Sequence, residues 1–68
     1  MDKDEMVRCW CRNACNGHPY EPGGFVLAIA NATLRADDDN FRILQPALLQ
    51  IIEKYPIYLK EHPDEPQL

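Results

Sequence analysis

The clearest alternation of apolar and polar positions lies between residues 37 and 55. Apolar side chains recur there at steps of three and four residues, which is typical of one face of an α-helix. We therefore predict an amphipathic surface helix over 37–55. The candidate N-caps at its start are Asp38, Asp39 and Asn40. Short polar side chains suit this position because they accept hydrogen bonds from the first backbone amides of a helix. The apolar face consists of Phe41, Leu44, Leu48, Ile51, Ile52 and Tyr55.

A proline interrupts this helical pattern. Pro46 has no N–H to donate to the carbonyl of Arg42, so we predict a kink with the ring on the solvent side, between Arg42 and Gln50. The Tyr-Pro pair at 55–56 ends or bends the helix, because the residue before a proline disfavours helical geometry. Residues 57–59 are predicted to add one more packed turn.

A first helix is predicted over residues 2–15. Asp2 is its candidate N-cap, and Glu5 follows three residues later, as in a capping box. The Asn-Gly pair at 16–17 is a stop signal, and the glycine- and proline-rich segment 17–24 reads as a loop. The apolar side chains of the helix cover about half of its circumference: Met6, Val7, Trp10, Cys11, Ala14 and Cys15.

A second helix is predicted over residues 24–36. Its apolar residues cover almost the whole circumference except a wedge at Asn31 and Arg35. A helix that is apolar nearly all round is expected to be central in its assembly. A buried strand over 25–30 is the alternative, but the alanines there favour a helix with close neighbours.

The short turn at 37–39 would join the second and third helices as an antiparallel helical hairpin. We therefore predict an all-α fold, a small three-helix domain spanning residues 1–61 and built on this hairpin. Tyr20 is expected to fold back onto the core. The acidic, proline-rich residues 62–68 are predicted to be a disordered tail. The expected core residues are Phe41, Leu48, Ile52, Leu27 and Ile29.

Composition and charge narrow the class of protein. A chain of 68 residues buries only about 60% of its unfolded surface, so its core is marginal and needs a metal, a disulfide or another chain. The net charge is −4 and the basic residues are scattered, which argues against nucleic-acid binding. No apolar run approaches the roughly 20 residues that span a bilayer, so no insertion into a membrane is expected. The acidic start lacks the features of a secretory signal, so a cytoplasmic location is expected.

Four potential metal ligands lie close together: Cys9, Cys11, Cys15 and His18. Three thiolates and an imidazole suit zinc, which would stabilise a small domain directly. On a helix, however, Cys9 points away from Cys11 and Cys15. The favoured hypothesis is that Cys11 and Cys15 are small, buried, metal-free apolar residues. A zinc site is the alternative, and a redox role is less favoured.

Catalytic patterns are weak. His18 and His62 stand apart from any serine or cysteine partner arranged as nucleophile and base, and the chain has little room for a substrate pocket. The acidic residues at 37–39 do not follow an EF-hand pattern, and helix capping with dipole stabilisation explains them. We therefore expect no enzymatic activity.

The excess of apolar surface on the second helix predicts self-association. The expected function is that of a non-enzymatic structural or protein–protein interaction module, a homo-oligomer that binds a partner protein. A phage or mobile-element accessory protein would suit this size. The alternative function is a zinc-stabilised binding module. The expected partner-binding residues are Phe25, Val26, Leu34, Leu49 and Tyr58.

Overall fold

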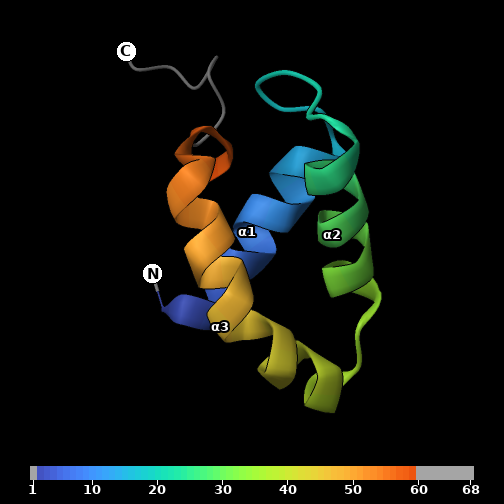
Figure 1. The fold of residues 1–68 in the computed structure, drawn as a ribbon, viewed down its shortest axis with the longest axis vertical. Helices are drawn as coiled ribbons and strands as arrows, with labels where there is room; N and C mark the ends of the chain where they lie inside the picture. Colours follow the sequence, from blue (N-terminus) through green and yellow to red (C-terminus); the bar gives the residue numbers. More distant parts are fainter. Residues whose placement is uncertain (1, 60–68) are drawn as a thin grey trace.

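The computed structural model describes residues 2–59 (Figure 1). It contains α1 (Lys3–Cys15), α2 (Gly24–Arg35) and α3 (Asp38–Lys54), followed by the short 3₁₀ helix η1 (Pro56–Leu59). No strand occurs within this range, so the all-helical prediction is confirmed and the strand alternative for 25–30 is wrong. The predicted tail at 62–68 lies outside the described residues.

Two aspartates begin α1 and α3. The Asp2 carboxylate accepts a hydrogen bond from the Glu5 amide at 2.8 Å, as predicted. The Asp37 carboxylate accepts one from the Asn40 amide at 2.9 Å and is the N-cap of α3. The cap therefore lies one residue earlier than the three candidates at 38–40, because Asp37 keeps an extended backbone while the residues after it are already helical.

The second half of α3 agrees with the sequence pattern. Pro46 lies inside the helix with an exposed side chain, as predicted. Figure 1 shows the first turns of α3 at an angle to its later turns, in agreement with the predicted kink. The helix ends at Lys54, and Tyr55 is its C-cap. The extra turn predicted at 57–59 is part of η1, in which Tyr58 is buried.

Helix α1 is the centre of the fold. It packs against α2, α3 and η1, whereas α2 and α3 hardly contact each other (Figure 1). The predicted hairpin of α2 and α3 is therefore not confirmed as a packed pair. Because α1 has neighbours on several sides, four of its side chains have no exposed surface: Val7, Trp10, Cys11 and Ala14.

Helix α2 packs on α1 with one face and does not occupy the centre. Val26, Ala30 and Thr33 point inward. Leu27 is 38% exposed, so its assignment to the core is wrong, and Ile29 is only partly buried against the core. The three core residues predicted on α3 are confirmed: Phe41, Leu48 and Ile52.

Polar contacts secure this packing without leaving buried groups unpaired. The Thr33 hydroxyl donates to the Ile29 carbonyl at 2.7 Å within α2. The guanidinium carbon of Arg8 lies 4.1 Å from the centre of the Phe41 ring, a cation–π contact between α1 and α3. Within residues 2–59, no buried side-chain nitrogen or oxygen lacks a hydrogen-bond partner.

None of the helices in the described part of the chain is long and apolar enough to cross a bilayer.

Two apolar residues of α3 provide a matched test of this core. Leu48 is fully buried, whereas Ile43 is 71% exposed. We expect Leu48→Ala to lower the free energy of unfolding by about 2–5 kcal/mol, because it removes buried methyl groups and leaves a cavity. Ile43→Ala should change it by less than about 0.5 kcal/mol. Urea unfolding of both variants checks this, and similar losses for the two would contradict the assigned orientation of α3.

Candidate functional site

The four potential zinc ligands do not converge. Cys11 is fully buried, whereas Cys9 and Cys15 are partly buried. The side-chain amide of Asn13 donates to the Cys9 sulfur at 3.7 Å. His18 lies in the turn after α1. Among the residues that the structure describes, no three His, Cys, Asp or Glu side chains form a group that could hold a metal ion. The zinc hypothesis therefore finds no support in this arrangement.

The environment of the thiols favours their neutral form. Burial raises the pKa of the Cys11 thiol from 9.0 to about 11, and a hydrogen bond with Thr33 opposes part of this rise. Burial also raises the pKa of Cys15. Neutral thiols are poor nucleophiles and poor metal ligands. These surroundings suit two packed cysteines, although the absence of metal stays a prediction.

The predicted partner-binding residues fall into two groups. Phe25 is 60% exposed, Leu34 is 37% exposed and Leu49 is partly buried. Val26 and Tyr58 are buried, because Val26 faces α1 and the Tyr58 ring packs edge-on against Trp10 with 6.1 Å between ring centres. In this fold Val26 and Tyr58 belong to the interior of the chain, so they do not offer a surface to a partner.

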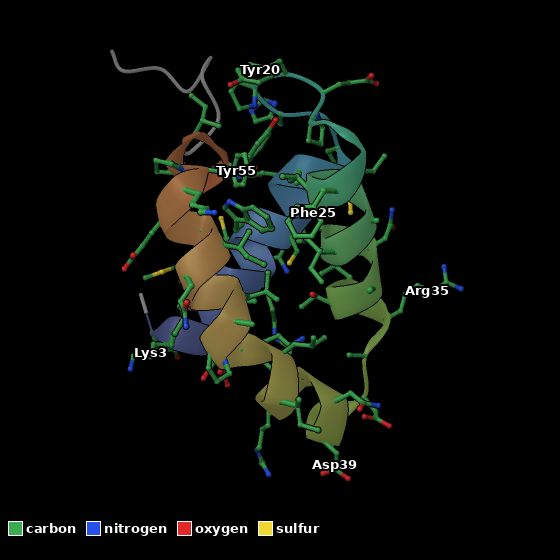
Figure 2. All side chains as sticks on the ribbon, in the orientation of Figure 1. Lys3, Tyr20, Phe25, Arg35, Asp39 and Tyr55 are labelled. Carbon is green, nitrogen blue, oxygen red and sulfur yellow. The ribbon has the colours of Figure 1, made fainter. Side chains whose placement is uncertain are left out.

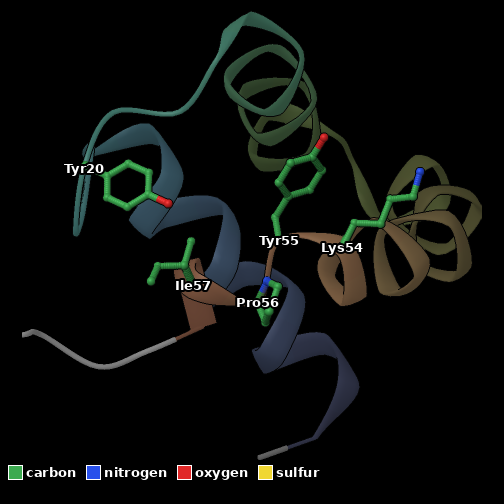
Figure 3. Close-up of a pocket in the computed structure, with 5 residues that line it drawn as sticks. All are labelled: Tyr20, Lys54, Tyr55, Pro56 and Ile57. Atoms are coloured by element: carbon green, nitrogen blue, oxygen red, sulfur yellow. The ribbon is translucent and has the colours of Figure 1, made fainter.

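A pocket lies at the end of α3, where the chain turns into η1. Its volume is about 360 Å³. Figure 3 shows Tyr20 and Ile57 on one side of it, Tyr55 and Lys54 on the other, and Pro56 between them. We call it the aromatic pocket, lined by Tyr20, Lys54, Tyr55, Pro56 and Ile57.

Helix α1 holds one wall of the aromatic pocket in place. The indole N–H of Trp10 donates to the Tyr55 carbonyl at 2.9 Å. The side-chain amide of Asn13 donates to the Tyr58 carbonyl at 2.7 Å. These two bonds tie both ends of the turn at 55–58 to the central helix, so its backbone is fixed relative to the core.

The loop after α1 supplies the other wall. Gly17 has a φ of 69°, a left-handed conformation that favours glycine. The loop then continues through a cis peptide bond between His18 and Pro19 to Tyr20. The Tyr20 ring contacts the edge of the Tyr58 ring with 5.8 Å between centres, yet Tyr20 stays 59% exposed. It therefore folds back onto the core as expected while keeping one face open.

A third exposed aromatic side chain lies at the same end of the molecule. Figure 2 shows Phe25, in the first turn of α2, near the end that carries Tyr20 and Tyr55. Sequence reasoning missed this grouping because Tyr55 was assigned to the apolar face of α3. The proline at 56 was the available signal, since it ends the helix beside Tyr55 and turns the chain.

The aromatic pocket is mainly apolar and carries a few polar groups. Its walls are two phenol rings, a proline ring and a branched aliphatic side chain, and Lys54 is the one charged residue among the five that line it. Apolar packing and hydrogen-bond donation are what these residues offer to a ligand.

Comparisons of the chain with protein-family models, curated proteins and solved structures found no match.

The Cys11 thiol predicts a specific dependence of stability on pH. Above pH 9 the thiol ionises in the unfolded chain, whereas in the folded chain it stays protonated until about pH 11. This contribution to stability is therefore fully present below pH 9 and is lost as the pH rises towards 11. We expect the unfolding free energy of the native sequence to fall more steeply over this window than that of Cys11→Ala. Urea unfolding under reducing conditions measures both, and parallel curves would contradict the prediction.

Proposed function

We propose that the chain is a non-enzymatic protein–protein interaction module that docks its partner at the aromatic pocket. The observation that carries this proposal is the exposure of Tyr20 and Tyr55 on opposite sides of one hollow, next to Lys54 (Figure 3). Tyrosine is enriched at protein interfaces because its ring buries a large area and its hydroxyl can still form a hydrogen bond.

The large exposed fractions of three aromatic side chains support a docking role. Tyr20 is 59% exposed, Phe25 is 60% exposed and Tyr55 is 39% exposed, although the core of this small chain has room for other rings such as Trp10. Aromatic side chains gathered at one end of a molecule are typical anchors of a binding surface. Phe25 thus extends the docking surface from the pocket to the first turn of α2.

Self-association remains part of the proposal, on a smaller surface than the sequence suggested. Val26 and Ala30 face α1 and are excluded from it. Phe25, Ala28 and Ala32 are exposed on α2 at helical spacing, so they form an apolar strip on which a second copy would pack closely. A two-fold dimer would cover the same strip on both copies.

The zinc-stabilised alternative has less support. Among residues 2–59, no three His, Cys, Asp or Glu side chains form a group that could hold a metal ion.

A capture experiment with matched variants tests the docking surface. The tagged chain would be immobilised and incubated with a lysate of the cells in which it occurs naturally. The retained proteins would then be quantified by mass spectrometry. Truncating a hot-spot tyrosine costs about 2 kcal/mol or more, roughly a 30-fold loss of affinity. We expect Tyr20→Ala and Tyr55→Ala to lose a partner that the native chain retains.

Ile43→Ala is the control, because it removes an apolar and more exposed side chain that does not line the pocket. It should retain the same partner as the native chain. Circular dichroism would verify that all three variants keep their helices. Retention of the same proteins by the tyrosine variants and by the native chain would refute the proposed docking surface.

A further inference from the structure

We propose that the aromatic pocket binds an extended peptide segment that combines proline with acidic residues. The proline ring would lie between Tyr20 and Tyr55, and a carboxylate would lie beside Lys54 (Figure 3). This inference rests on the proposed function and specifies the chemistry of the partner.

The size and walls of the pocket select a short extended segment. A volume of about 360 Å³ is at the lower end of the range for ligand pockets, roughly 300–1,000 Å³, so it admits a few side chains and not a folded element. Proline-rich segments dock on aromatic-lined grooves because their polyproline conformation is already formed and loses little entropy on binding. The Tyr20, Tyr55 and Pro56 rings supply such walls.

The polar groups of the pocket match a ligand rich in acceptors. Lys54 offers three N–H donors and each tyrosine hydroxyl can donate. The Tyr55 carbonyl already accepts the Trp10 indole N–H. Proline has no backbone N–H, and an ionised carboxylate only accepts. A segment of prolines and acids therefore presents few donors that would lack a partner there.

The charge of the pocket also favours an acidic ligand. Lys54 is the one charged residue among those lining the pocket, so a carboxylate placed beside it gains a favourable charge interaction and a lysine there is repelled. Glu21, next to Tyr20 in the loop, lines a different hollow together with Cys15 and Leu27. A basic peptide is thus the disfavoured partner.

The chain itself contains a segment of this composition, which provides a defined probe. Its residues 62–68 read HPDEPQL, with two prolines flanking two acids. A synthetic peptide of this sequence would be titrated into the isotope-labelled full-length chain, and backbone amide shifts would be followed by NMR. We expect saturating shifts centred on Tyr20, Tyr55 and Ile57.

Two altered peptides separate the contributions of charge and ring. HPKKPQL replaces both acids by lysine, and HADEAQL replaces both prolines by alanine. HPKKPQL should bind up to about five-fold more weakly, since one exposed ion pair contributes up to about 1 kcal/mol. HADEAQL should also bind more weakly, because it lacks the proline rings that would pack between the tyrosines. Equal affinity of the three peptides would overturn the proposed recognition.

Variants of the chain place the site. Lys54→Glu should reverse the preference between HPDEPQL and HPKKPQL, and Tyr20→Ala should weaken both. Ile43→Ala should leave the affinities unchanged, because Ile43 does not line the pocket. Absence of shifts at the pocket, or shifts that Tyr20→Ala does not reduce, would overturn the inference.

Two further outcomes are informative. In the first, the peptide HPDEPQL changes no NMR signal, but the double substitution Pro63→Ala and Pro66→Ala in the chain itself shifts the amide signals of Tyr20 and Tyr55. The segment would then act within its own chain, and docking of a separate peptide would be overturned. If no peptide binds but capture still depends on Tyr20 and Tyr55, only the partner chemistry is wrong. Failure of that capture as well would refute the proposed function itself.

Discussion

The hydrogen bond from the Trp10 indole to the Tyr55 carbonyl, with the edge contact of the Trp10 and Tyr58 rings, fixes the end of α3 on the central helix. Trp10 has no exposed surface and Tyr58 is 2% exposed, so the contact is formed in the dry interior. Asn13 adds a second bond from α1 to the Tyr58 carbonyl. The aromatic pocket depends on this contact, since Tyr55, Pro56 and Ile57 lie on the turn that it holds.

The central position of α1 explains both the closed core and the open surface. Because α2 and α3 each pack on α1 and hardly on each other, each helix buries one stripe. On α2 the stripe consists of Val26, Ala30 and Thr33, and the remaining apolar residues except the partly buried Ile29 stay exposed. Where α1, the following loop and the end of α3 meet, the rings of Tyr20 and Tyr55 are left facing a hollow. The same packing that stabilises the chain thus produces its candidate docking surface.

Local features of the fold could be predicted from the sequence, and long-range ones could not. The cap at Asp2, the exposed Pro46 and the final packed turn follow from backbone chemistry within a few residues. The central role assigned to α2 was wrong within this chain, because apolar content does not determine which faces of a helix have neighbours. The pocket joins Tyr20 to residues 54–57, and only tertiary structure shows that they meet.

The substitution Trp10→Phe tests the central contact most directly, because it keeps an aromatic ring but removes the donor to Tyr55. We expect the free energy of unfolding to fall by about 1–3 kcal/mol, since the partly buried Tyr55 carbonyl loses its partner and the smaller ring packs less fully in a buried position. By NMR, the amides of Ile57 and Tyr58 should shift and exchange faster with solvent, whereas the amide of Ala30 in α2 should not. Destabilisation with unchanged signals from residues 56–59 would contradict the role of Trp10 in holding the pocket wall.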